Sequence, residues 1–309
     1  MSAEASDTRM ILVKGAPGEE AFGKLFSEWV EQWESVGKKG EVAMVTIGDE
    51  PVEGREDVDR FKELLAALPE DGEPLWIVLI GHGTFDRRDA RFNMVGPDFT
   101  AKELDEWLVR FSRKVVIINA ASASGPFLDR LSRQGRVVVT ATKSGTEVNF
   151  ARFGGYLAHA ISSDEGDLDK DGQTSLLEAY LLASKLTEEF YQSEGRLATE
   201  HALIDDNGDA KGTRSEFFQG VRAVKKPKGG ASIDGELAHQ LHLVLGEFEK
   251  AIPSELRAKR DELEKKVFEL REKRNQLDED AYYDQLEELM LQIGKIYAEA
   301  ERRLQTKGS

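Results

Sequence analysis

The sequence of 309 residues contains no cysteine. Disulfide bonds and thiolate metal sites are therefore excluded, and cysteine usage says nothing about the redox compartment. No uninterrupted apolar run approaches the roughly 20 residues that a transmembrane helix needs. Basic residues are outnumbered, because 42 Lys and Arg stand against 58 Asp and Glu, which gives a net charge of −16. That charge repels phosphate backbones and anionic lipid surfaces, so we expect neither nucleic-acid nor membrane binding.

We expect no secretory signal either, because residues 1–9 form a short polar segment without an apolar core. We therefore expect a soluble protein whose compartment the sequence leaves unknown, although a calcium-type loop described below favours an extracytoplasmic one. The hydrophobic content of 40% over 309 residues is enough for a sizeable globular core.

Apolar runs that resemble strands alternate with segments of helical periodicity over residues 10–224. This order predicts an α/β fold, with a mostly parallel sheet covered by helices on both faces. Thr100 and Glu103 form a capping box that should begin one of the helices. The predicted strands cover residues 10–13, 41–47, 75–80, 115–119 and 136–142, and the predicted helices cover residues 22–33, 58–68, 101–111 and 176–191.

The C-terminal part has a different composition. Residues 225–230 mix Lys, Pro and Gly and are the best candidate for a linker. Residues 231–309 should form a short helix and then a coiled-coil-type α-helical hairpin, with long helices over 255–276 and 279–304. Because two helices alone bury too little surface, we expect the hairpin to dock on the sheet domain or, by self-association or partner binding, on another chain. Leu241, Leu245 and Phe248 favour docking on the sheet domain.

Two of the predicted buried strands end in residues that suit a functional site. Residues 75–80 lead to His82, which stands between two glycines, and residues 115–119 lead to Ala120, Ala121 and Ser122. Ligands of open α/β sheets bind beyond the carboxyl ends of such strands. We therefore predict that His82 and one of the three small side chains face a common cleft. For the other histidines, including His201, we expect structural roles.

Residues 167–178 match the twelve-residue EF-hand calcium loop, with glycine at the sixth position. Calcium requires six to eight hard oxygen ligands, and this spacing wraps them around one point. Thr174 replaces the usual aliphatic residue, and residues 162–166 interrupt the incoming helix, so a paired EF-hand sensor is not expected. The alternative is an acidic turn that caps the next helix. The predicted calcium ligands are Asp167, Asp169, Asp171, Gln173, Ser175 and Glu178.

A second oxygen-rich loop follows at residues 205–209. Asp205, Asn207 and Asp209 could also bind a metal ion, but no glutamate follows at the spacing that an EF-hand needs.

The order of these motifs resembles the caspase-like (clan CD) cysteine peptidases, nearest to the legumain-type C13 peptidases and their bacterial relatives, over residues 10–224. In that family a His-Gly pair follows one buried strand and the nucleophilic cysteine follows the next. The resemblance implies that His82 is the acid/base and that the Gly83 amide binds the oxyanion of a peptide or protein substrate. It also implies that Ser144, Gly145, Thr146 and Glu147 border the substrate pocket.

The nucleophile of that family is absent. Counting from the strand end places it at Ala120 or Ala121, whereas counting back from residues 124–125 places it at Ser122. An alanine there means a natural pseudoenzyme or a deliberate replacement, and a serine is a weaker nucleophile than a thiol. Two hypotheses follow. The first is a calcium-binding peptidase domain that is inactive as written, and the second is a non-enzymatic scaffold or binding protein on the same fold.

Overall fold

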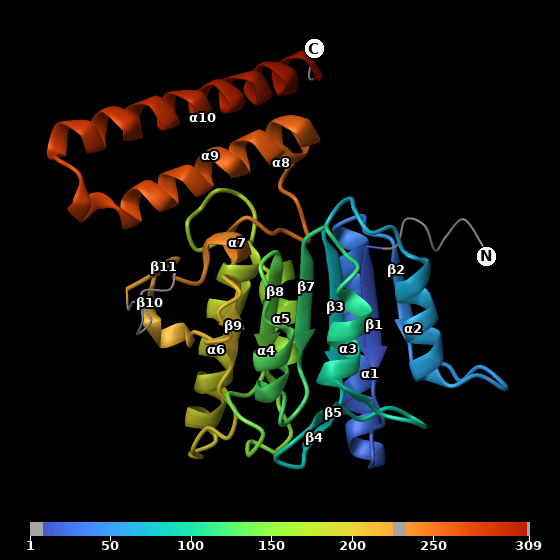
Figure 1. Ribbon diagram of the computed structural model, residues 1–309. Coiled ribbons are helices and arrows are strands. Elements are labelled where there is room, and N and C mark those ends of the chain that lie inside the picture. The colour runs from blue at the N-terminus through green and yellow to red at the C-terminus, as the bar shows by residue number, and fades with distance from the viewer. Residues whose placement is uncertain (1–8, 225–232, 308–309) are drawn as a thin grey trace. The chain divides into compact units, whose positions relative to one another are not determined.

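The computed structural model describes residues 9–224 and 233–307 (Figure 1). The described chain forms two compact units. The sheet unit contains the chain to Lys170 and Thr174–Val244, and the helical unit contains Asp171–Gln173 and the chain from Leu245. The linker predicted at residues 225–230 lies outside the described residues.

The segment after that gap belongs to the sheet unit as far as Val244. Ala238, Leu241 and Leu243 are at most 3% exposed and pack in the core of the sheet unit. The helical unit consequently begins at Leu245, whereas the sequence suggested residue 231.

The sheet unit is built on a six-stranded sheet with the order β2-β1-β3-β7-β8-β9. The first five strands are parallel, and β9 joins the edge antiparallel to β8. The predicted α/β architecture with a mostly parallel sheet is therefore confirmed. The strands are β1 (Met10–Lys14), β2 (Met44–Ile47), β3 (Leu75–Ile80), β7 (Val115–Asn119), β8 (Arg136–Thr140) and β9 (Leu203–Asp205).

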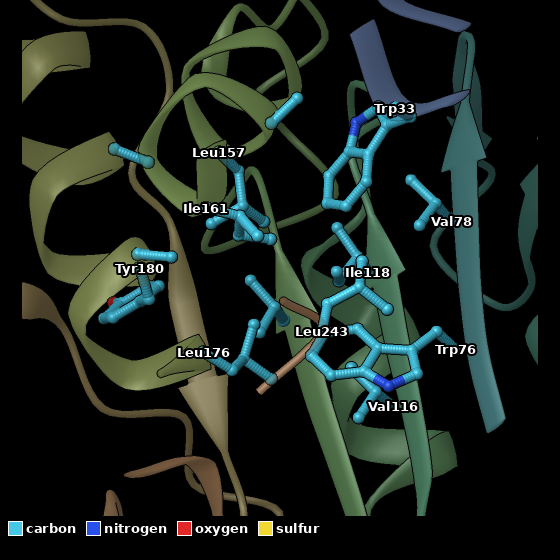
Figure 2. Packing of buried hydrophobic residues seen from close by; sticks show 14 of the residues in the cluster. Trp33, Trp76, Val78, Val116, Ile118, Leu157, Ile161, Leu176, Tyr180 and Leu243 are labelled. Atoms are coloured by element: carbon cyan, nitrogen blue, oxygen red, sulfur yellow. The ribbon is translucent and has the colours of Figure 1, made fainter. Parts of the chain in front are cut away.

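Helices cover both faces of the sheet, because side chains of a buried strand alternate between two cores. In β3, Trp76, Val78 and Ile80 enter one core while the residues between them enter the other. Figure 2 shows Trp33 and Trp76 beside Ile118 in the first core. The first core is covered by α1 (Glu20–Lys39), α5 (Phe153–Ser162) and α6 (Leu176–Ser193), and the second by α2 (Asp57–Ala67), α3 (Ala101–Leu108) and α4 (Gly125–Leu131).

Local sequence signals set several of these boundaries. The predicted capping box is present, since the Thr100 hydroxyl accepts from the Glu103 amide and the Glu103 carboxylate accepts from the Thr100 amide.

A small antiparallel sheet beyond β3 was not predicted, because its strands are too short to show the two-residue hydrophobic alternation of a strand. The remaining elements of the unit are β4 (Gly83–Phe85), β5 (Ala90–Phe92), β6 (Phe99–Thr100), η2 (Ser215–Phe217), β10 (Phe218–Gln219), β11 (Arg222–Ala223) and α7 (Glu236–His239).

The helical unit consists of α8 (Glu247–Ala251), α9 (Ser254–Glu272), η3 (Arg274–Gln276) and α10 (Glu279–Lys307). Helices α9 and α10 form an antiparallel pair (Figure 1). Leu263 and Val267 of α9 pack against Ile293 and Ile296 of α10. No helix among the described residues has the length and hydropathy of a membrane span.

Candidate functional site

His82 follows β3 after Gly81 and lies on the face of the sheet that α1 covers. Its ring centroid lies 4.9 Å from that of Phe22 and 5.2 Å from that of Phe26, both in edge-on geometry. Burial lowers the pKa of His82, partly offset by a hydrogen bond to the Pro17 carbonyl and by the charge of Glu19. The imidazole is thus held neutral among aromatic rings, with one ring nitrogen bonded to backbone.

The three candidate nucleophile positions follow β7, the neighbour of β3, with Leu79 paired to Asn119. Alternation places Ala120 on the same face as His82, where its Cβ lies against Gly154 of α5. Ala121 packs in the opposite core. The exposed fractions of Ala120, Ala121 and Ser122 are 1%, 0% and 2%.

The Gly83 amide, which the family resemblance makes an oxyanion donor, already has a partner inside the chain. It donates to Ser122 Oγ at 3.3 Å, and the Ser122 hydroxyl lies 3.5 Å from the Gly83 carbonyl. A Cβ on Gly83 would lie 2.4 Å from the Ser122 carbonyl oxygen, so the two segments are in direct backbone contact. The Ser122 side chain therefore already occupies the acceptor position at the Gly83 amide.

The segment predicted to border a substrate pocket follows β8. Ser144 Oγ lies 2.8 Å from Thr146 Oγ1, and Gly145 packs so closely on the Phe85 ring that any side chain would clash. Glu147 turns inward, and its Oε2 accepts from the Lys143 amide at 2.9 Å.

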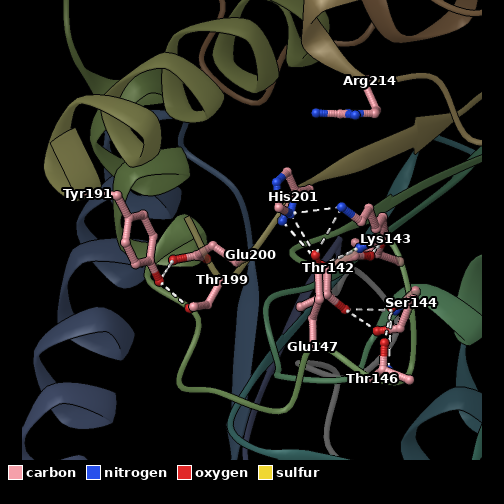
Figure 3. Close-up of polar contacts among 12 residues, drawn as sticks. Thr142, Lys143, Ser144, Thr146, Glu147, Tyr191, Thr199, Glu200, His201 and Arg214 are labelled. Carbon is pink, nitrogen blue, oxygen red and sulfur yellow. Dashed lines mark hydrogen bonds and ion pairs between the residues drawn. The ribbon is translucent and has the colours of Figure 1, made fainter. Parts of the chain in front are cut away.

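Glu147 also contacts His201, a residue for which the sequence suggested only a structural role. Glu147 Oε1 lies 2.5 Å from His201 Nδ1, and the Lys143 Nζ lies 3.5 Å from the same carboxylate oxygen (Figure 3). A carboxylate bonded to Nδ1 fixes the ring and leaves Nε2 for another partner. No spacing in the sequence connects these residues, since 54 positions separate them.

His201 lines a cavity of about 150 Å³ together with Arg214 and Glu188. Glu200 forms another wall and is only 3% exposed. Its carboxylate accepts hydrogen bonds from the backbone amides of Arg152 and Phe153, where α5 begins, and from the Tyr191 hydroxyl. Glu200 therefore holds the start of α5 in place.

The calcium-type loop brings part of its predicted ligand set together. One carboxylate oxygen from each of Asp167, Asp169 and Asp171 lies within 4.8 Å of the others along this continuous segment. Gly172 has φ +91°, the left-handed conformation that a tight loop requires. Three hard oxygens around one point are suited to a divalent cation such as Ca²⁺.

These carboxylates also bond within the protein, since Asp171 Oδ1 accepts from the Gln173 amide at 3.0 Å and Asp169 Oδ2 lies 3.1 Å from His239 Nε2. The other predicted ligands do the same. Glu178 Oε1 accepts from the Leu168 amide at 2.8 Å, and Oε2 accepts from the Ser175 amide at 2.8 Å. The Ser175 hydroxyl accepts from the Glu178 amide, so these two residues form the capping box of α6. Gln173 donates its side-chain amide to Asp171 Oδ2. The loop thus combines an acidic cluster with the helix cap that was the alternative interpretation.

In the second oxygen-rich loop, each predicted ligand has a bond inside the protein. Asp205 Oδ2 accepts from the Ser132 hydroxyl, and Asp205 is fully buried. Asn207 Oδ1 accepts from the Asp209 amide, and Asp209 Oδ1 accepts from the Lys211 amide.

Sequence reasoning missed the buried partner of this loop. Asp206 Oδ1 and Oδ2 accept from the amides of Gly235 and Ala238, which begin α7. Asp234 Oδ1 accepts in return from the Asp206 amide at 3.1 Å. The two carboxylates fasten the last segment of the sheet unit beside β9.

Comparisons with known proteins give matches to solved structures alone. No protein-family model and no curated protein sequence matches the chain. The Drosophila initiator caspase Dronc is 11% identical, with a TM-score of 0.43, and the match covers 68% of this chain and 84% of that one. Caspase-1 from Spodoptera frugiperda is 10% identical, with a TM-score of 0.42, covering 65% and 87%. A secreted C11 cysteine protease from Bacteroides thetaiotaomicron, solved with an irreversible peptide inhibitor, is 11% identical with a TM-score of 0.38, covering 64% and 66%.

Proposed function

We propose that the sheet unit is a caspase-like peptidase domain that has no peptidase activity and acts by binding a protein or peptide. The order of the motifs supports the peptidase descent, because His82 and Gly83 follow β3 and the small residues 120–122 follow its neighbour β7. The loss of activity is supported by the absence of cysteine.

One contact carries this proposal. The Ser122 hydroxyl is bonded to the Gly83 amide at 3.3 Å, in the place that an oxyanion would need. Ser122 bonds to backbone there, whereas a nucleophilic serine requires a base within hydrogen-bond reach. A peptidase that uses Ser122 is therefore the less favoured alternative.

Single cysteine variants test whether a thiol at residues 120–122 can still act as a nucleophile. Because the chain has no other thiol, Ala120→Cys, Ala121→Cys and Ser122→Cys each report on one position. In the folded state, we expect the thiol of each variant to react with a thiol reagent about 100-fold more slowly than the thiol of the control Leu197→Cys. The Leu197 side chain is 90% exposed. We also expect no cleavage of a mixed peptide library.

Peptide cleavage by one of these variants would contradict the proposal. If one variant cleaved peptides and lost that activity on His82→Ala, the chain would be a peptidase that lacks only its thiol. Equal labelling in denaturant confirms that each variant carries an intact cysteine.

We propose in addition that residues 167–178 bind Ca²⁺, since three carboxylates converge there. Asp167, Asp169 and Asp171 would hold the ion together with the Gln173 carbonyl, and Glu178 would join by giving up an amide contact. Bound calcium would neutralise the acidic cluster and fix the loop before α6.

Calcium should stabilise the folded protein. At a concentration about 100 times the Kd, a ligand of the native state adds about 2.7 kcal/mol to the free energy of unfolding. For a domain of this size the expected rise in melting temperature is several degrees. Asp171→Asn should remove the rise, while Asp164→Asn, an exposed carboxylate outside the cluster, should keep it. An unchanged melting temperature in chelator-treated protein would contradict calcium binding.

A further inference from the structure

The helical unit carries a groove that its own residues do not fill. Two cavities of about 590 and about 420 Å³ lie along α9 and α10, and both are lined by Glu288 and Gln292. They therefore form one continuous groove. Its apolar lining includes Leu256, Leu263, Leu270 and Leu277, which recur every seven residues, together with Leu289 and Ile296.

Three lysines follow the same seven-residue spacing along the α9 side of this groove. The ammonium groups of Lys259, Lys266 and Lys273 form no ion pair and no hydrogen bond among residues 9–224 and 233–307. A row of unpaired cations beside a heptad of leucines is suited to a helix with acidic flanks.

The chain itself supplies such a helix. The first half of α10 carries the exposed acidic residues Asp280, Asp284 and Glu287. It also carries Leu291, which is 60% exposed and lines the groove. Gly294 has open space where a side chain would stand, so another helix can approach closely.

The charged residues on either side of Leu291 can pair with the same residues of a second copy. Glu288 lies three residues before Leu291 and Lys295 lies four residues after it, and both line the groove. Neither has an ion-pair partner within the part of the chain that the structure describes. When two copies of α10 cross antiparallel with Leu291 on the two-fold axis, Glu288 of each copy faces Lys295 of the other.

We propose that this groove is the interface with a second copy of the chain. In the two-fold dimer, α10 of each copy lies along the groove of the other, Leu291 meets its symmetry mate, and two Glu288–Lys295 pairs flank that contact. The acidic first half of each α10 then lies beside Lys259 and Lys266 of the other copy. The inference concerns the helical unit alone and holds whether or not the sheet unit is catalytic.

Sedimentation velocity of the full chain over micromolar to submillimolar concentrations tests the proposal. We expect a reversible monomer–dimer equilibrium that weakens as salt is added, because exposed ion pairs are screened. Leu291→Asp should abolish the dimer. The matched control Met290→Asp changes a neighbouring side chain, 50% exposed and absent from the groove lining, and should leave the Kd unchanged.

Charge reversal distinguishes this dimer from nonspecific association. Glu288→Lys and Lys295→Glu should each raise the Kd about tenfold, because each reversed charge acts twice in a two-fold interface. An equimolar mixture of the two variants should recover the wild-type Kd, since every pair is then again of opposite sign. Far-ultraviolet circular dichroism and the melting temperature establish that each variant is folded.

A wild-type chain that stays monomeric throughout would overturn the proposal and leave the groove to the sheet unit or to another protein. A dimer that survives Leu291→Asp, or a mixture that recovers no affinity, would overturn it equally, because the copies would then associate through another surface.

Discussion

The free energy of unfolding of the sheet unit is expected to fall as the pH rises from about 4 to about 8. The cause is the buried pair Asp206 and Asp234, which are 6% and 2% exposed. Burial raises the pKa of Asp234 from 3.8 to about 8, with a further contribution from the charge of Asp206. Burial likewise raises the pKa of Asp206.

The sign follows from proton binding. Between 3.8 and about 8 the folded protein holds a proton on Asp234 that the unfolded chain releases. The contribution of Asp234 to the free energy of unfolding is therefore fully present below its pKa in the unfolded chain. This contribution is lost as the pH rises through its pKa in the folded protein. Each pH unit over which one such group differs is worth about 1.4 kcal/mol, so the expected loss is several kcal/mol.

Tryptophan fluorescence during urea unfolding measures this unit alone, because all four tryptophans precede residue 110. Asp234→Asn should flatten the dependence on pH and raise the stability at about pH 8, since the amide oxygen still accepts from the Asp206 amide. Asp164→Asn, an exposed control, should leave the slope as it is. A stability that rises with pH, or a slope that Asp234→Asn does not alter, would refute this assignment.

The sequence predicted the central strands because they are buried on both faces. Residues 75–80 and 115–119 are apolar at nearly every position, a pattern typical of an interior strand of a parallel sheet. Strand β9 escaped prediction because it has three residues and lies at the edge, where neither length nor period gives a signal.

The candidate site was predictable only in part. That His82 and residues 120–122 lie at neighbouring strand ends follows from strand order. The contact between Gly83 and Ser122 does not follow, because it depends on how two turns approach each other in space. The pairing of Glu147 with His201 is likewise a tertiary contact with no local pattern.

Acidic residues around Asp205 show why composition alone does not decide between a metal site and a turn. Asp205, Asn207 and Asp209 have the oxygen atoms that a metal site requires, yet in the fold each accepts a hydrogen bond from a neighbouring amide or hydroxyl. A run of carboxylates serves equally well to satisfy backbone N–H groups in a turn. The choice between these roles depends on Ser132 and the other segments packed around the loop.

Glu200→Ala is expected to destabilise the sheet unit by about 3 to 5 kcal/mol. The side chain is 3% exposed, and it is the acceptor for two amides at the start of α5 and for the Tyr191 hydroxyl. Removing it leaves the two buried amides without this acceptor and opens space against the cavity beside His201, while the Tyr191 hydroxyl keeps Thr199 as a partner. Burial raises the pKa of Glu200, and these donors together with the charge of Arg152 favour its charged form.

Two further variants separate loss of the acceptor from loss of volume. Glu200→Gln keeps the size and one acceptor oxygen but turns an NH2 group toward an amide, so we expect an intermediate cost of about 1 to 3 kcal/mol. Glu188→Ala, an exposed carboxylate on another wall of the same cavity, should change the stability by less than about 0.5 kcal/mol. Urea unfolding followed by tryptophan fluorescence gives all three values. If Glu200→Ala proved as mild as Glu188→Ala, α5 would not depend on Glu200, and Trp33, which donates to the Gly154 carbonyl at 3.2 Å, would be the more important contact of this helix.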